Sequence, residues 1–258
     1  MPSPTRRNLS KALHLFVFVL SATVHLASHA YAEDKADDRT TRMLAQTTRD
    51  LERDTAALAR DPGSVALLSH RGDCHLFLGH FAAAVADFEK MIALEPAQDA
   101  PHWRLGIAYY FAGDFIKSAS QFEKYHAHDG GDRENGIWKF LAQARTLGLP
   151  KARASMLVYT RFDREPFPGL YEVFAGTRGS DDLFRELERK DLLRNEQVMF
   201  FANYYAGLNE ALLGNRQRAI ELVRKAVAGS WGSATEGSPT YMWQVARLHA
   251  ARLEAGSE

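Results

Sequence analysis

Two consecutive stretches of 34 residues decide the fold: residues 65–98 read VALLSHRGDCHLFLGHFAAAVADFEKMIALEPAQ, and residues 99–132 read DAPHWRLGIAYYFAGDFIKSASQFEKYHAHDGGD. When the stretches are superposed, Gly72 coincides with Gly106, Gly79 with Gly113, Phe81 with Phe115, and Phe88 with Phe122. Pro62 also lies 34 residues before Pro96, so the same register begins one unit earlier. A fixed period of this length is typical of solenoid proteins built from stacked repeats.

Each repeated residue has a mechanical role in a pair of helices. The first glycine of a unit lets two helices approach where a side chain would clash, and the second can take the left-handed conformation that ends a helix. Ala84 and Ser118 supply small residues to the second helix, and its phenylalanine is expected to fill the space between units. Pro96 ends the second helix of its unit because proline cannot continue a helix.

These residues resemble the tetratricopeptide-repeat (TPR) consensus, which places a small residue, then alanine or serine, then an aromatic residue and a proline at fixed positions. The two units carry these residues: Gly72, Ala84, Phe88 and Pro96 in the first, and Gly106, Tyr109, Ser118, Phe122 and Tyr125 in the second. The resemblance implies an all-α fold, a superhelix of about ten helices in antiparallel pairs.

The rest of the chain is less regular, with a degenerate middle section. We expect five parts: a signal peptide at 1–32, an N-terminal capping helix region at 33–64, two regular TPR units at 65–132, a degenerate unit plus short-helix insertion at 133–199, and a C-terminal TPR-like unit with a capping helix at 200–258. A short helix is expected over 151–159 and a loop over 160–169. The final helix is expected over 241–253, with Arg247, Arg252 and Glu254 facing outward as a solenoid cap requires.

The first 32 residues have the pattern of a cleaved export signal. Arg6, Arg7 and Lys11 precede an apolar run over 13–20, and Ala30-Tyr31-Ala32 supplies the small residues of a cleavage site. The product is therefore expected to be periplasmic or secreted, by the general secretory or the twin-arginine route. No cysteine lies near the cleavage site, so no lipid anchor is expected. The apolar run is too short and wrongly flanked to be a membrane span.

Composition argues against several classes of function. The formal net charge is zero, whereas nucleic-acid binding needs a basic patch. Cys74 is the single cysteine, which rules out an internal disulfide framework and a multi-cysteine metal site. His70, His75 and His80 are spaced by five, which scatters them around a helix. We therefore expect no enzyme, no catalytic residues, no metal and no cofactor.

The order of units resembles that of the NlpI type of bacterial envelope TPR protein. The resemblance is carried by residues 106–110, 137–142, 171–176 and 201–205. It implies a homodimeric scaffold that brings cell-wall hydrolases and an envelope protease together. Those proteins are lipid-anchored, and this chain has no cysteine to acylate.

The binding surface of a TPR stack is a groove formed by the first helix of each unit. The expected protein-binding groove consists of Asp73, Phe77, Trp103, Arg104, Ile107, Tyr110 and Phe111. Clusters of aromatic residues and arginine are enriched at binding hot spots. The alternative is that some of these rings pack beneath the insertion or a capping helix. The positions that clamp a chaperone's C-terminal carboxylate hold no lysine or asparagine, so the groove should prefer apolar or aromatic segments or a partner helix.

Two functions follow. The first is an exported scaffold or adaptor for protein–protein interactions in the cell envelope, for which the resemblance implies cell-wall hydrolases or proteases as clients. The alternative is a periplasmic secretion or assembly chaperone for one dedicated client. An enzyme with a site assembled from scattered residues is the least favoured option.

Overall fold

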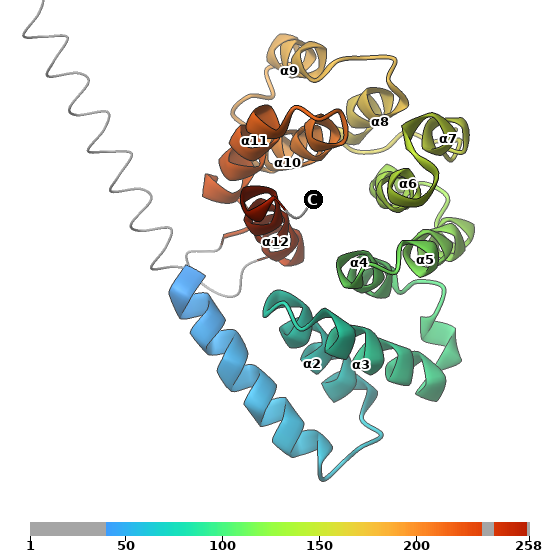
Figure 1. Ribbon diagram of the computed structural model, residues 1–258, viewed down its shortest axis with the longest axis vertical. Coiled ribbons are helices and arrows are strands. Elements are labelled where there is room, and N and C mark those ends of the chain that lie inside the picture. The colour runs from blue at the N-terminus through green and yellow to red at the C-terminus, as the bar shows by residue number, and fades with distance from the viewer. Residues whose placement is uncertain (1–39, 234–239, 257–258) are drawn as a thin grey trace, which may run out of the picture. The chain divides into compact units, whose positions relative to one another are not determined.

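The computed structural model describes residues 40–233 and 240–256, and the regular elements in these ranges are all helical (Figure 1). A helix over residues 40–58 comes first. The later elements are α2 (Val65–Phe77), α3 (Phe81–Leu94), the 3-10 helix η1 (Pro96–Gln98), α4 (Trp103–Ala112), α5 (Phe115–His128), α6 (Arg133–Leu147), α7 (Leu149–Ala154), α8 (Phe167–Ala175), α9 (Ser180–Arg189), α10 (Glu196–Leu212), α11 (Arg216–Ala228) and α12 (Tyr241–Ala255).

The chain divides into two units, Met1–Gln46 and Thr47–Glu258. All the contacts discussed below lie within the second unit. The expected signal peptide falls outside the described residues. None of the helices within 40–233 and 240–256 is both long and apolar enough to cross a bilayer.

The repeats fold as helical hairpins, and the glycines act as predicted. A Cβ atom on Gly72 would lie 2.5 Å from the Phe88 ring, and one on Gly106 would lie 2.7 Å from the Phe122 ring. Each phenylalanine therefore packs on the glycine of its own unit. The Phe88 ring also lies 4.8 Å from the ring of His102, so it contacts the following unit as well.

The second glycine of each unit ends its first helix. Gly79 and Gly113 have φ angles of 81° and 83°, in the left-handed region that glycine adopts without strain. Ser118 strengthens the hairpin of the second unit, because its Oγ donates a hydrogen bond of 2.8 Å to the carbonyl oxygen of Gly106. The same construction recurs in the C-terminal unit, where a Cβ atom on Gly207 would lie 2.6 Å from Val223.

The close approach at Gly106 yields a stability prediction. Gly106→Ala should lower the free energy of unfolding by roughly 1–3 kcal/mol, because the new methyl group collides with the buried Phe122 ring. Gly63→Ala is the matched control, since a Cβ atom there meets nothing within 4 Å. Urea denaturation of both variants checks the prediction. Equal stability of the two variants would contradict the packing at Gly106.

Two expected segments in the middle of the chain differ from the structure. The short helix predicted over 151–159 is α7, which begins earlier and ends at Ala154. Ser155 follows it, and the Ser155 hydroxyl donates to the carbonyl oxygen of Lys151 at 2.8 Å, which satisfies an acceptor at the helix end. The loop predicted over 160–169 is shorter, because α8 already begins at Phe167 and holds Pro168 in its first turn, where proline is tolerated.

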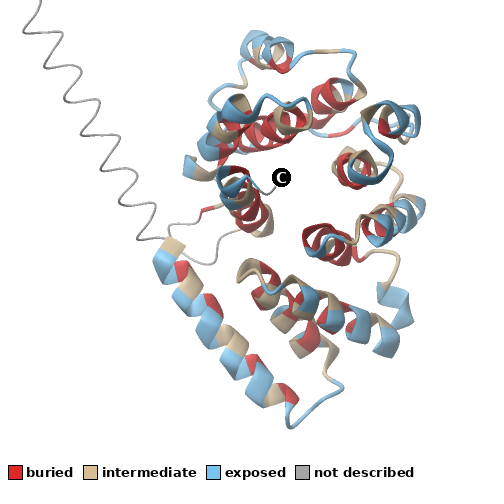
Figure 2. Ribbon diagram, viewed as in Figure 1, coloured by how far each residue is buried: buried red, intermediate tan, exposed pale blue. Residues whose placement is uncertain are grey.

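The final helix, α12, packs on the first helices of the repeats. Its buried His249 ring lies 5.6 Å from the Tyr110 ring of α4, 5.7 Å from the Trp138 ring of α6 and 5.7 Å from the Tyr204 ring of α10. The Tyr204 hydroxyl also lies 2.6 Å from His249 Nδ1. Figure 2 shows buried residues on α4, α6, α10 and α12. The core of the second unit therefore includes α12.

The prediction that Arg247 and Arg252 face outward is wrong. Arg247 donates a hydrogen bond of 2.6 Å to the carbonyl oxygen of Phe77. Arg252 donates to the carbonyl oxygen of Phe111, and its guanidinium lies 4.9 Å from the Phe81 ring centroid. The carbonyl groups at the ends of α2 and α4 lack partners within their own helices, so they attract these guanidinium groups. Arginines on a helix that packs inside the repeats therefore bind helix ends.

Candidate binding pocket

The predicted groove residues divide into a covered group and an open group. Ile107, Tyr110 and Phe111 are all buried, and α12 packs against the last two. Tyr110 and Phe111 could contact a partner only if α12 moved. Their role in binding stays a prediction.

The open group surrounds Trp103, which is half-buried at the start of α4. Its ring packs edge-on against Tyr241 of α12, with 4.7 Å between centroids, and Tyr241 also packs against Phe77 at 4.9 Å. Asp73 and Arg104 form an ion pair between α2 and α4, and Arg104 also donates to Ser69 Oγ at 2.8 Å. Burial raises the pKa of Asp73 to about 6 despite this pair.

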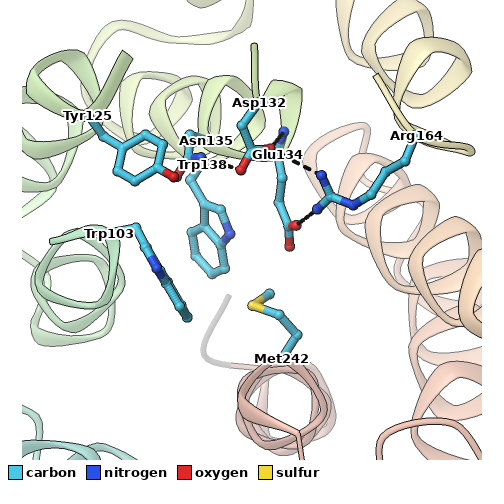
Figure 3. A pocket seen from close by; sticks show the side chains of 8 residues that line it. All are labelled: Trp103, Tyr125, Asp132, Glu134, Asn135, Trp138, Arg164 and Met242. Carbon is cyan, nitrogen blue, oxygen red and sulfur yellow. Dashed lines mark hydrogen bonds and ion pairs between the residues drawn. The ribbon is translucent and has the colours of Figure 1, made fainter. Parts of the chain in front are cut away.

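A cavity of about 220 Å³ opens beside Trp103 (Figure 3). Its walls come from α4, α5, α6, the segment before α8, and α12. The lining residues are Trp103, Tyr125, Asp132, Glu134, Asn135, Trp138, Arg164 and Met242. Two indole rings and a thioether thus face two carboxylates and a guanidinium across one small space.

The N-terminus of α6 positions the acidic wall. Asp132 is the N-cap, and its carboxylate accepts hydrogen bonds from the Glu134 backbone N–H at 3.0 Å and from the Asn135 side-chain amide at 2.7 Å. An N-cap aspartate satisfies backbone N–H groups that have no partner within the helix. The preceding Gly130-Gly131 turn and this cap fix where α6 begins, and so fix where Glu134 enters the cavity.

Glu134 is held by groups from two distant segments. Its Oε1 accepts a hydrogen bond of 2.6 Å from the Tyr205 hydroxyl, and its Oε2 accepts one of 2.6 Å from Arg164. The Trp138 indole N–H donates to the same Tyr205 oxygen at 3.0 Å. Each polar atom in this chain of contacts has a partner, so the carboxylate is rigidly placed.

Carboxylates outnumber cations at this wall. Asp163 accepts hydrogen bonds from the backbone N–H groups of Arg133 and Arg164, at 2.9 and 2.7 Å. Three carboxylates therefore face the single guanidinium of Arg164, whose NH1 lies 3.6 Å from Asp132. Burial, together with the charge of Asp132, raises the pKa of Glu134 to about 7. Burial also raises the pKa of Asp132.

The cavity is smaller than the roughly 300–1,000 Å³ of typical small-molecule sites, so it suits a single side chain. Within the described part of the chain, its lining contains no serine, cysteine or histidine that could act as a nucleophile or a base paired with Glu134. The expectation that the protein is not an enzyme stays a prediction.

Of the residues that line the cavity, only Trp103 belongs to the predicted protein-binding groove. A signal for the acidic wall was present, since Asp132 follows two glycines directly before an apolar helix, as an N-cap would. Arg164 and Met242 lie 30 and more residues from that wall along the chain, and nothing local in the sequence places them beside it. No protein-family model matches this chain.

Proposed function

We propose that this chain is an exported TPR-type scaffold that binds other proteins, and that the cavity beside Trp103 accepts one side chain of a partner. The observation that supports this most directly is the pairing of two tryptophans with an acidic wall on the face of the first helices. The expected export signal puts the partners in the cell envelope. Cell-wall hydrolases or proteases are the client class that the resemblance suggests.

The chemistry of the cavity favours a lysine or arginine side chain. The indole rings of Trp103 and Trp138 and the thioether of Met242 offer apolar surface to its methylene stem. The carboxylates of Asp132 and Glu134 attract its charged head, and aromatic faces attract cations as well. Arg164 neutralises only part of that negative charge. The sequence predicts that the groove prefers apolar or aromatic segments. The cavity adds a preference for segments that also contain a lysine or arginine.

The alternative function is a secretion or assembly chaperone for one dedicated client. The same cavity serves either role, and no contact among residues 40–233 and 240–256 favours the chaperone over the scaffold. Homodimerisation stays an expectation from the resemblance, which light scattering at micromolar concentration would test.

Peptide binding gives the direct test. Peptides selected from a library against the purified protein should be enriched in a lysine or arginine next to an apolar residue. Trp103→Ala should weaken their binding by roughly tenfold or more, because truncation of a central aromatic anchor costs about 1–2 kcal/mol or more. Isothermal titration calorimetry measures the change in Kd.

Ile116→Ala is the matched control, because Ile116 is a large apolar residue on α5 that is 76% exposed and outside the cavity. It should leave the Kd unchanged. Replacing the basic residue of the peptide by norleucine should weaken binding to the wild type and have less effect on binding to Trp103→Ala. Peptides that bind both protein variants equally would show that the site lies elsewhere.

A further inference from the structure

A second cluster of reactive side chains lies away from the cavity, between the helix over residues 40–58 and α2. It consists of Asp54, His70 and Cys74. Each residue offers one ligand atom, and the three atoms lie within 4.8 Å of one another. His70 Nδ1 is in direct contact with Asp54 Oδ2 and lies 3.9 Å from Cys74 Sγ. Asp54 and Cys74 are buried, whereas the His70 side chain is half exposed.

The three residue types and their spacing fit a metal ion. His70 and Cys74 are four residues apart on α2, so their side chains share one face of the helix. Thiolate, imidazole and carboxylate are the ligands that Zn²⁺ uses in proteins. With bond lengths of about 2.0–2.3 Å, the ligand atoms of a tetrahedral zinc ion lie about 3.3–3.7 Å apart. Shifts well below the width of an atom would bring the three atoms to that spacing.

The surroundings of the cluster complete the comparison with known zinc sites. The carboxylate oxygen of Asp54 that does not contact His70, Oδ1, accepts hydrogen bonds from Arg53 Nε at 3.1 Å and Nη2 at 3.0 Å. Zinc-binding side chains are commonly held by a second group in this way. The exposed side of His70 gives an ion a path from solvent. The predicted absence of a metal rested on spacings between histidines, whereas the spacing of four here joins a histidine to the single cysteine.

We propose that Asp54, His70 and Cys74 bind one Zn²⁺ ion, which joins the helix over residues 40–58 to α2. The ion displaces the proton of the Cys74 thiol and takes the lone pairs of Nδ1 and Oδ2. Because the ligands come from two helices, the bound ion stabilises the start of the repeat array. This site is independent of the cavity and of the proposed binding function.

Zinc titration of the purified chain without a purification tag tests the proposal. Calorimetry should show one ion per chain, and zinc at about a hundredfold excess over its Kd should raise the Tm by about 5 °C or more. Mg²⁺ should have no such effect because it prefers oxygen ligands. Co²⁺ in place of zinc should show a sulfur-to-cobalt charge-transfer band, which requires the thiolate as a ligand.

Variants assign the ligands. His70→Gln should lower zinc affinity by tenfold or more without unfolding the chain, since His70 is half exposed. Cys74→Ser should abolish the cobalt band, and circular dichroism checks that it folds. His128→Gln is the control, a histidine exposed at the end of α5. Absence of the cobalt band from the wild type would overturn the proposal. So would binding that survives both ligand variants and is lost in His75→Gln, because it would place the ion at the contact between His75 and His80.

Discussion

Trp243→Ala is expected to lower the free energy of unfolding by about 3–5 kcal/mol, the usual cost of truncating a buried aromatic side chain to alanine. Trp243 is 2% exposed, and its indole N–H donates a hydrogen bond of 2.9 Å to the carbonyl oxygen of Val227 at the end of α11. A Cβ atom on Gly232 would lie 3.0 Å from Trp243 Cβ, so the backbone of the preceding segment packs closely against it. The residue thus anchors α12 to α11.

Loss of that anchor has a second consequence. Tyr110 and Phe111 lie beneath α12, so a variant with a loosened α12 exposes the rings that the sequence placed in the groove. Trp243→Ala should therefore bind a hydrophobic fluorescent dye below its unfolding transition, while the wild type should not. Urea denaturation and dye fluorescence measure the two effects.

Ala251→Ser serves as the control because Ala251 is exposed on the same helix. It should change the free energy of unfolding by no more than about 0.5 kcal/mol. If the control bound the dye as strongly as Trp243→Ala, dye binding would not report the displacement of α12. A Trp243→Ala protein as stable as the wild type would show that α12 contributes little to the core.

The repeats were predictable because their signals are local. Gly72 and Gly106 tolerate no side chain beside a phenylalanine of the next helix, and Gly79 and Gly113 need a left-handed backbone. A period of 34 residues repeats these constraints, so they are visible in the sequence without knowledge of the tertiary structure. The all-helical architecture follows from such features.

The position of α12 was not predictable in this way. Tyr241, Trp243 and His249 give the helix several aromatic faces, and an aromatic helix can cover either the end of a solenoid or its inner face. Arg247 and Arg252 favoured the wrong position, at the end of the repeats, because arginines in a sequence are most simply interpreted as solvated. Their partners are backbone carbonyl groups of Phe77 and Phe111, more than a hundred residues away, and a carbonyl group leaves no mark in the sequence.

The same argument applies to the cavity. Glu134 and Tyr205 are 71 residues apart and Arg164 lies between them in sequence, so only the folded chain brings the three together. Burial makes Glu134 unusual, because it removes the carboxylate from water, and the start of α6 places the carboxylate beside Asp132. Its chemical character is a property of the tertiary structure.

That character predicts how stability depends on pH. The pKa of Glu134 rises from an ordinary 4.5 to about 7 in the folded chain, first through burial and then through the negative charge of Asp132. Between these two values the folded state holds a proton that the unfolded state has lost, so stability falls as pH rises. The interval corresponds to about 3 kcal/mol, an upper limit, which is lost between pH 4.5 and pH 7.

Glu134→Gln should remove this dependence. Glutamine still accepts a hydrogen bond from Tyr205, and Arg164 keeps its contacts with Asp132 and Asp163. The variant should match the wild type at pH 5 and exceed it by about 1–3 kcal/mol at pH 8, as urea denaturation at both values would show. Asp73 titrates with a raised pKa in both proteins, so its contribution cancels in the difference between the two curves. Asp132 is coupled to Glu134 by charge, so the difference reports Glu134 together with this coupling.

The control for this experiment is Glu172→Gln, at an exposed glutamate on α8 that pairs with Arg178 outside the cavity. Its stability curve should run parallel to that of the wild type. A Glu134→Gln curve that is also parallel would mean that Glu134 titrates near its ordinary pKa.

If the cavity binds a basic side chain, the wild type should bind its peptide more tightly at pH 8 than at pH 6, because only the ionised carboxylate attracts the cation. If Glu134→Gln bound the peptide equally at both pH values, the same ionised carboxylate that lowers the stability of the chain would be the group that attracts the basic side chain.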